Sequence, residues 1–515
     1  MTFLQKLLDY YQLDESAYAR LVRPLSEDDL PRRDDFEDLG RIVARIHRAI
    51  FDHEKIVIYG DYDADGVLAT SILVDAFKRM DYDVGYYVPN RYQDGYGLQV
   101  GKVQEISDKG YRLIITVDNG VNAHEAVTKA YELDLEVILT DHHEFSADIP
   151  RNEGVLHPFI SKNPFPYCGA VMALILSRAL LGHLEPYHLA LASIATISDM
   201  MPLYNGNRDL VRLGLSVMNE KKFSTINLLA EGQPIDENLI AMTIAPSINA
   251  IGRLTENSTI NRLVKYFISE DIAEQMTLAN WIKETNRSRK ELTHSAIITL
   301  PSLEGEETAI VHLSHEKEGL IGLLANRLVN QYERPVVVFT LDSSDPSLLI
   351  GSARTPLGYN LIEAFEKLRS YFIKGGGHAN AGGLTIEVSR YDDFKAAFIK
   401  HFTEVKVDRI TPASILIGLQ EFSFENYEIL RSLSPFGQGF KAPIFRFEGL
   451  RTDQLHFIKD GRYLATPLGF DRKILGFGVS KAKIGNANSI NLNGFLKVQT
   501  YKSRPELVFM VQSFD

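Results

Sequence analysis

The sequence predicts an α/β protein with a parallel-sheet domain, a second α/β domain joined to it by a long helix, and a C-terminal antiparallel β domain. Three observations carry this prediction. Short β-rich runs alternate with helical runs from Lys55 to Thr140, the same alternation returns from Ala309, and short β runs dominate after about Glu404. Alternating strands and helices are typical of a parallel, doubly wound sheet, whereas closely spaced short strands are typical of a small barrel or sandwich.

Five segments follow in order along the chain. The first has helical periodicity, and the third is long and polar, as a helix between two domains would be. The expected division is an N-terminal helical segment over 1–50, a catalytic α/β domain over 51–270, a connecting helix over 271–300, a second α/β domain over 301–404 and a β domain over 405–515.

The composition is that of an ordinary globular protein. The chain has 515 residues, of which 45% are hydrophobic and 24% charged, which leaves room for about three domains. Its single cysteine, Cys168, cannot form an internal disulfide, and this fits a reducing cytosol. The N-terminus lacks a secretory pattern and the apolar runs are too short to span a bilayer, so we expect a cytoplasmic protein without a membrane partner.

The charge is unevenly distributed. The net charge is −12, which taken alone argues against nucleic-acid binding. The segment from Lys406 to Asp515, however, contains 15 Lys and Arg residues and only 10 Asp and Glu residues. This basic C-terminal segment is consistent with a groove for a nucleic-acid strand, and equally with a weakly basic, solvated surface.

Potential metal ligands follow three of the predicted parallel strands. "IYGDYDADG" supplies Asp61, Asp63 and Asp65, "IITVDNG" supplies Asp118, and "ILTDHHEF" supplies Asp141, His142 and His143. Because parallel strands end at the same edge of a sheet, we expect these side chains to converge. A calcium-binding EF-hand is excluded, since the glutamate required at loop position 12 is replaced by Ile72 and a β-rich run precedes the loop.

The ligand types indicate hydrolytic chemistry. Alternating aspartates in an extended segment point the same way, and oxygen with imidazole ligation without thiolate suits manganese, magnesium or catalytic zinc. Two such cations about 3.5 to 4 Å apart are the usual arrangement for hydrolysing phosphate esters. Any one of these acidic residues is as well explained by a helix cap or a solvated turn. The whole set at one sheet edge favours a metal site.

The motifs resemble a known superfamily. "GDYDADG", "VDNG", "DHH" and the later "SDMMPL" are similar, in order and spacing, to the four motifs of the DHH phosphoesterases. The resemblance implies two Mn²⁺ or Mg²⁺ ions, with Asp118 as the bridge. It assigns Asp63 and Asp118 to one ion, Asp65, Asp118, His142 and Asp199 to the other, Asp61 to an outer or first-metal position, and His143 to a supporting or phosphate-contacting role.

Further segments narrow the family. "PNRYQDGYGL", "SINAIGRL", "GSARTPLGYNL" and "GGGHANAGGLTIE" resemble the RecJ-type single-stranded-DNA exonucleases, in which the DHH domain is followed by a DHHA1 domain and an OB-type nucleic-acid-binding domain. The substrate-binding candidates are placed in Gly-bearing segments, where guanidinium forks and backbone groups suit phosphate oxygens. They are Arg91, Arg253, Ser352, Arg354, Gly376, Gly377 and His378.

The resemblance implies a 5′-to-3′ exonuclease acting on single-stranded DNA in repair or recombination, with a helicase or single-strand-binding protein as candidate protein partners. A phosphodiesterase of short oligonucleotides or cyclic dinucleotides is the alternative, but it would not need the domain after Glu404. A catalytically dead scaffold would be expected to lack metal ligands, and every expected ligand is present. The chain departs from the family at Phe440 and Lys441, where an Asn-Pro pair is usual, so the resemblance does not predict the path of the DNA over the C-terminal domain.

Overall fold

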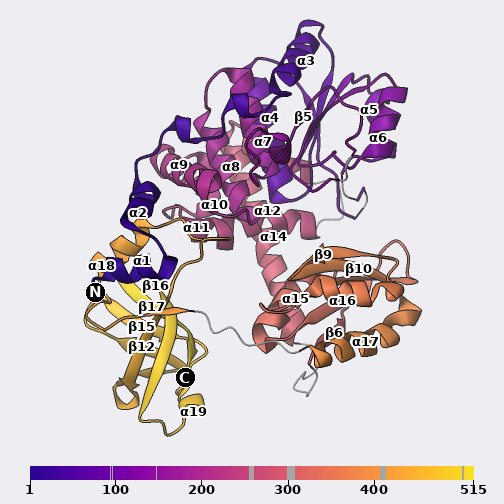
Figure 1. Cartoon of the computed structure of the whole chain (residues 1–515). Coiled ribbons are helices and arrows are strands. Elements are labelled where there is room, and N and C mark those ends of the chain that lie inside the picture. The colour runs from indigo at the N-terminus through magenta and orange to yellow at the C-terminus, as the bar shows by residue number, and fades with distance from the viewer. Residues whose placement is uncertain are drawn as a thin grey trace. The chain divides into compact units, whose positions relative to one another are not determined.

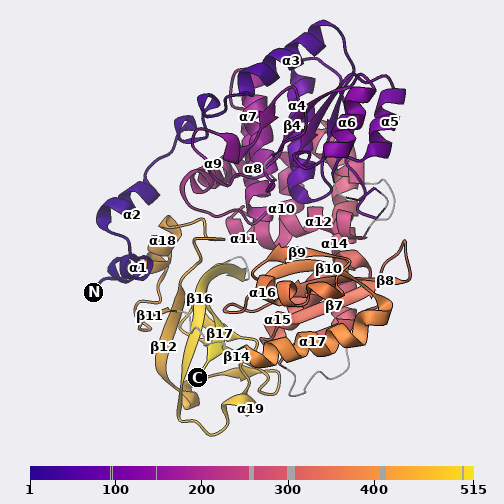
Figure 2. The ribbon, with the colours of Figure 1, turned by 45° about the vertical axis from the view of Figure 1, so that its right-hand side comes forward.

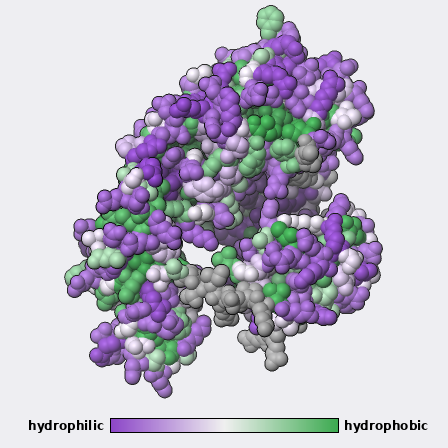
Figure 3. All heavy atoms as spheres, viewed as in Figure 1, coloured by the Kyte–Doolittle hydropathy of each residue, from purple (hydrophilic) through white to green (hydrophobic). Residues whose placement is uncertain are grey.

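The computed structural model describes residues 1–92, 94–95, 97–145, 148–254, 260–298, 308–405, 413–501 and 504–515. Two compact units emerge. The smaller consists of 1–29, 202–212 and 411–515, and the larger of 30–201 and 213–410. Among the described residues, no helix has both the length and the apolar character needed to cross a membrane. The face drawn in Figure 3 is mostly hydrophilic, broken by small hydrophobic patches.

The first sheet of the larger unit is entirely parallel, in the order β2-β1-β3-β4-β5. Strands β1 and β3 are buried along their whole length, as expected when both faces are covered by helices. The strands are β1 Ile56–Tyr59, β2 Gly85–Tyr87, β3 Leu113–Val117, β4 Glu136–Thr140 and β5 Val155–Leu156.

Helices cover both faces of this sheet, with α5 and α6 on one side and α4 and α7 on the other (Figure 1). Val57, Ile114 and Val137 point toward α5 and α6, and the alternate residues of the same strands point toward the opposite layer. The helices are α3 Leu39–Phe51, α4 Ala64–Arg79, α5 Val100–Asp108, α6 His124–Glu132, α7 Gly169–Leu181, α8 Pro186–Ser198, α10 Ser224–Ala230, α11 Glu237–Leu239, α12 Ala245–Leu254 and α13 Asn261–Ile268. A further helix, α9 Asn205–Lys221, begins in the smaller unit and continues into the larger.

The long helix α14 Ile272–Ile298 precedes a second, mixed sheet in the order β6-β7-β8-β10-β9. Among the described strands of this sheet, only β6 and β7 pair in parallel. Helix α15 packs on one face through Ile321 and Leu324, and α16 and α17 pack on the other through aromatic side chains (Figure 2). The elements are β6 Ile310–Leu313, α15 Glu318–Tyr332, β7 Val336–Leu341, β8 Leu348–Arg354, α16 Leu361–Lys367, β9 Lys374–His378, β10 Ala381–Glu387 and α17 Tyr391–Glu404.

The smaller unit is built on a seven-stranded sheet in the order β11-β12-β16-β17-β15-β14-β13. Most pairs are antiparallel, as predicted, but β11 with β12 and β15 with β17 are parallel. The elements are α1 Phe3–Tyr11, α2 Glu15–Val22, β11 Ser414–Leu416, α18 Phe424–Ser432, β12 Ile444–Arg451, β13 Phe457–Ile458, β14 Tyr463–Pro467, β15 Arg472–Gly476, α19 Lys481–Ile484, β16 Ser489–Tyr501 and β17 Arg504–Phe514.

The N-terminal helix α1 contributes to the core of this smaller unit. Phe3 and Leu7 are buried with Ile415 and Phe445, and the Phe3 and Phe445 rings stack with centroids 5.7 Å apart. Both views place α1 beside α18 at one end of the sheet (Figures 1 and 2). The predicted fold class is confirmed. The segment expected over 1–50 is divided between the two units, and the other proposed domain boundaries stay predictions.

Candidate metal centre and phosphate cavity

The predicted ligands lie together at the carboxyl edge of the first sheet. Three groups of side chains each have ligand atoms within 4.8 Å of one another. They are Asp61, Asp63 and Asp118; Asp65, His142 and Asp199; and Asp118, His142 and His143. Asp118 and His142 each belong to two groups, and of these two residues only Asp118 was expected to bridge two cations.

His142 occupies the centre of the cluster. Its Nε2 atom lies 3.0 Å from Asp118 Oδ1, 3.6 Å from Asp65 Oδ2 and 3.7 Å from Asp199 Oδ2. Although Asp118 Oδ1 is this close, the two groups are not oriented as a hydrogen bond, and this oxygen has no hydrogen-bond partner. Burial lowers the pKa of His142, which keeps the imidazole neutral with a lone pair available to a cation.

Two aspartates of the first motif, Asp63 and Asp65, accept hydrogen bonds from N–H groups at the starts of two helices. Asp63 precedes α4, and its Oδ1 accepts a hydrogen bond from the Gly66 N–H at 3.1 Å. Asp65 reaches the start of α7, where its two oxygens accept from the Gly169 and Ala170 N–H groups at 2.7 and 2.8 Å. These N–H groups have no partner within the helix and carry partial positive charge, so they favour a carboxylate.

Two close approaches explain glycines near the site. A Cβ at Gly66 would lie 2.5 Å from the Asp61 carbonyl oxygen, and a Cβ at Gly169 would lie 2.7 Å from the Asp118 side chain. Asp118 itself has φ +63°, a left-handed conformation that non-glycine residues rarely adopt. Such strain concentrates at functional sites, and here it turns the carboxylate into the cluster.

Asp141 is hydrogen-bonded to the segments that carry the predicted ligands. Its carboxylate accepts hydrogen bonds from the N–H groups of Val121, His142 and His143, and its Oδ1 lies 2.8 Å from His143 Nδ1. Burial acts to raise the pKa of Asp141, but the hydrogen bond and charge of His143, together with the hydrogen bonds from backbone N–H groups, outweigh this and lower it. For His143, burial acts to lower the pKa, and the hydrogen bond and charge of Asp141 raise it to about 9.

The remaining carboxylates repel one another. Burial and neighbouring carboxylates raise the pKa of Asp61, Asp63 and Asp118, and burial with the charges of Asp65 and Asp63 raises the pKa of Asp199 to about 8. Asp61 Oδ1 and Asp199 Oδ2 are buried without a hydrogen-bond partner. Buried oxygens that repel one another and have no donor fit divalent cations, which would satisfy them and offset their charge.

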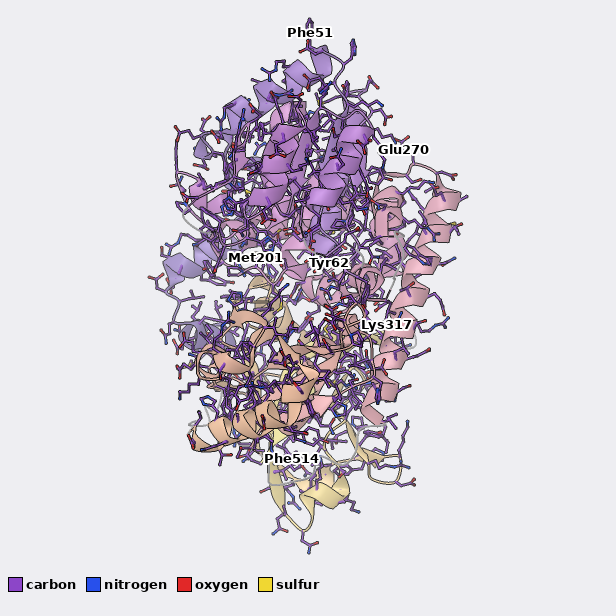
Figure 4. All side chains as sticks on the ribbon, turned by 90° about the vertical axis from the view of Figure 1, so that its right-hand side faces the viewer. Phe51, Tyr62, Met201, Glu270, Lys317 and Phe514 are labelled. Carbon is purple, nitrogen blue, oxygen red and sulfur yellow. The ribbon has the colours of Figure 1, made fainter. Side chains whose placement is uncertain are left out.

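A second feature of the larger unit is a cavity of about 480 Å³ lined by cationic side chains. Five of the residues that the sequence offered as substrate-binding candidates line it, namely Arg91, Arg253, Ser352, Arg354 and Gly376. Tyr62, between Asp61 and Asp63, lines it as well. Figure 4 shows Tyr62 at the end of the first α/β part that is remote from Phe51 and near the second α/β part.

The arginines are held firmly at this cavity. Arg91 lies over the Tyr62 ring with its Cζ 4.7 Å from the centroid, and Arg354 donates to Ser352 Oγ at 3.1 Å. Burial and the like charge of Arg91 lower the pKa of Arg253 to about 10. Cationic groups brought together at such a cost favour an anion such as a phosphate.

Two predicted substrate-binding residues are placed elsewhere. Gly377 and His378, with Arg369, line a different cavity of about 410 Å³, to which Gly375 and Gly376 also contribute. Strand β9 therefore separates the two cavities. The sequence motif did not indicate which side of the strand each residue serves.

The lining residues that the sequence did not single out include three with large polar side chains, namely Tyr62, Glu318 and Lys374. Signals for two of them were present. Tyr62 alternates with the aspartates, so it points away from them, and Lys374 directly precedes the glycine run. Glu318 opens α15, and only the packing of that helix places it at the cavity.

Comparison with known proteins accords with this geometry. Residues 55–197 match the DHH family N-terminal domain, 307–404 the DHHA1 domain and 415–513 the RecJ OB domain. The single-stranded-DNA-specific exonuclease RecJ of Bacillus subtilis is 32% identical over 441 residues, which are 82% of this chain and 56% of that protein. The RecJ of Dickeya dadantii is 31% identical over 80% of this chain and 78% of its own length.

A solved structure shares the same fold. The crystal structure of RecJ in complex with Mn²⁺ from Thermus thermophilus superposes with a TM-score of 0.83 and 25% identity, and the match covers 99% of this chain and 77% of that one. The chain thus spans little more than half of the B. subtilis relative and about three quarters of the other two proteins. The three matched domains, in this order, and the 31% identity to a relative of which the chain covers 78% establish that the chain belongs to the RecJ family of single-stranded-DNA-specific exonucleases.

Proposed function

We propose that this protein is a metal-dependent exonuclease that hydrolyses phosphodiester bonds of single-stranded DNA from the 5′ end. The observation that carries the proposal is the presence, in one compact unit, of a carboxylate and histidine cluster and an arginine-lined cavity. The cluster suits the bond that is cleaved, and the cavity suits a terminal phosphate. The names of the RecJ relatives support this substrate.

The proposed cofactor is a pair of Mn²⁺ or Mg²⁺ ions. The unpartnered oxygens of Asp61, Asp118 and Asp199 support this donor set, and the Thermus relative was solved with Mn²⁺. Asp63 and Asp118 would hold one ion, with Asp61 beside them, and Asp65, Asp118, His142 and Asp199 the other. Bound between these residues, the ions would activate water and offset charge on the phosphate oxygens.

The chain's own residues position the substrate and protons. Asp141 holds the Nδ1 atom of His143, whose raised pKa keeps the ring protonated at neutral pH. The His143 side chain is 39% exposed, against 12% for His142, so it is the better placed of the two to contact a substrate phosphate. Arg91, Arg253 and Arg354 would bind a terminal phosphate with Ser352 and the backbone of Gly376.

The C-terminal part of the smaller unit is proposed to bind the DNA strand, because residues 415–513 match the RecJ OB domain. OB folds bind single strands by basic grooves and stacked aromatic rings. A role for Gly377 and His378 in contacting the same strand stays a prediction. So do a role in DNA repair or recombination, a helicase or single-strand-binding protein as partner, and a cytoplasmic location.

The test uses purified protein with Mn²⁺ and four substrates: end-labelled single-stranded DNA, the matching duplex, dinucleotides and pyrophosphate. We expect single-stranded DNA carrying a 5′ label to lose that label in the first products, with duplex DNA degraded far more slowly. Hydrolysis of dinucleotides with long single strands left intact would contradict the proposal and favour a small-substrate phosphodiesterase.

A further inference from the structure

Asn249 connects two of the segments that carry metal ligands. It lies on α12, and its Oδ1 accepts a hydrogen bond from the Ala64 N–H at 2.9 Å while its Nδ2 donates to Ser198 Oγ at 3.2 Å. Ala64 stands between Asp63 and Asp65, and Ser198 directly precedes Asp199. One side-chain amide therefore joins the first ligand segment to the last.

The orientation of this amide follows from its partners. The Ala64 N–H can only donate, so the atom facing it is the amide oxygen, and the NH₂ group is left for the Ser198 hydroxyl, which can accept. Ala64 is fully buried at the first position of α4, where its N–H has no partner within the helix. Asn249 supplies that partner, while Asp63 supplies one for Gly66.

Helix α12 also contacts this ligand segment through its backbone. A Cβ at Gly252 would lie 2.7 Å from the Tyr62 carbonyl oxygen, so no side chain separates the helix from the loop that carries the aspartates. The next residue, Arg253, lines the arginine cavity. A shift of α12 would thus be transmitted both to the ligand segments and to the cavity.

We propose that Asn249 is a positioning residue that fixes the separation of Asp65 from Asp199, and so sets the affinity of the site for the cation that these two residues share. The inference rests on the proposed two-metal site. Asn249 does not touch the cation. It acts through the backbone at Ala64 and through Ser198, and groups that orient metal ligands in this way typically change metal affinity by about 10- to 100-fold.

The experiment measures Mn²⁺ binding to the metal-free full-length protein, from the electron paramagnetic resonance signal of unbound Mn²⁺. The variants are Asn249→Ala, Ser198→Ala and the double variant. The control is Asn219→Ala, which removes an amide that pairs with both the N–H and the carbonyl of Ile235, away from the ligands. Circular dichroism and thermal unfolding verify that each variant is folded.

We expect Asn249→Ala to weaken one of two Mn²⁺ sites by about tenfold or more, Ser198→Ala to weaken the same site less, and the double variant to resemble Asn249→Ala. The control should bind Mn²⁺ like the unaltered protein. Unaltered Mn²⁺ binding in Asn249→Ala, or in Ser198→Ala if the first variant does not fold, would overturn the inference. Failure of the unaltered protein to bind two Mn²⁺ ions would instead contradict the proposed metal site.

Discussion

Replacing Asp65 by asparagine tests whether this carboxylate serves the start of α7 as well as a cation. Its two oxygens accept from the buried N–H groups of Gly169 and Ala170 at 2.7 and 2.8 Å. Asparagine keeps one oxygen and turns an NH₂ group toward the other N–H. One charge-assisted hydrogen bond, worth about 1.5 to 3 kcal/mol, is lost and a buried donor is left unpaired. Relief of the repulsion with Asp63, Asp118 and Asp199 offsets part of this loss, so we expect the free energy of unfolding to fall by about 1 to 3 kcal/mol.

Asp118→Asn is the matched variant. Asp118 Oδ1 has no hydrogen-bond donor, and burial with four neighbouring carboxylates raises its pKa. Asparagine tolerates the left-handed conformation at this position and removes the repulsion. In metal-free buffer, the free energy of unfolding should therefore hold or rise, by up to about 2 kcal/mol. Both variants should lose about a thousandfold or more of the nuclease turnover, since each removes a ligand.

The assay is urea unfolding at 25 °C in EDTA, followed by circular dichroism, with turnover measured separately in Mn²⁺. We expect stability changes of opposite sign in the two variants, with the same loss of turnover. An equal decrease in stability in both variants would refute the role of Asp65 at the start of α7. Substantial turnover in Asp118→Asn would refute the bridging role.

Three further outcomes are expected. In EDTA, the free energy of unfolding should fall as the pH rises from about 4 to 8. Asp199 has a pKa of about 8 in the folded protein, so over this range the folded protein keeps a proton that the unfolded chain has released. Thermal unfolding in Mn²⁺ should no longer show this slope. Arg354→Ala should lower kcat/KM for 5′-phosphorylated oligonucleotides by about 10- to 100-fold and leave the Mn²⁺ affinity unchanged. Replacement of the exposed Arg41 by alanine is the control and should have no effect. Equal losses in the two variants would contradict the assignment of the cavity to a terminal phosphate. Arg208→Met should destabilise the smaller unit by about 3 kcal/mol in calorimetry, because the buried guanidinium donates to the carbonyls of Leu433, Ser434 and Pro435; an unchanged transition would contradict this.

The fold class and the position of the metal cluster follow from local patterns. Asp61 to Asp65, Asp118 and His142 each come directly after a parallel strand, and the geometry of such a sheet places them at one edge. Asp199 is different, since it follows the helix α8, and only the family resemblance identified it. Strand periodicity therefore predicts the part of the site that strands carry.

Contacts between segments that are far apart in the chain could not be predicted from the sequence. The pairing of Asp65 with Gly169 depends on how α7 packs, and the two residues are 104 positions apart. The division of the glycine run between two cavities depends on the neighbours of β9. Likewise, the periodicity of α1 showed an apolar face, but not the β unit that it would cover.

That position of α1 has a consequence for synthesis of the chain. Lys6 pairs with Glu421, 415 positions further on, and Phe3 and Leu7 are buried among strands that are translated last. At about 5 to 20 residues per second, the helix would wait roughly 20 to 80 s for its partners. The larger unit has all its residues available first, so we expect it to form while the apolar face of α1 is still exposed. This makes the first helix a natural contact for a chaperone during translation.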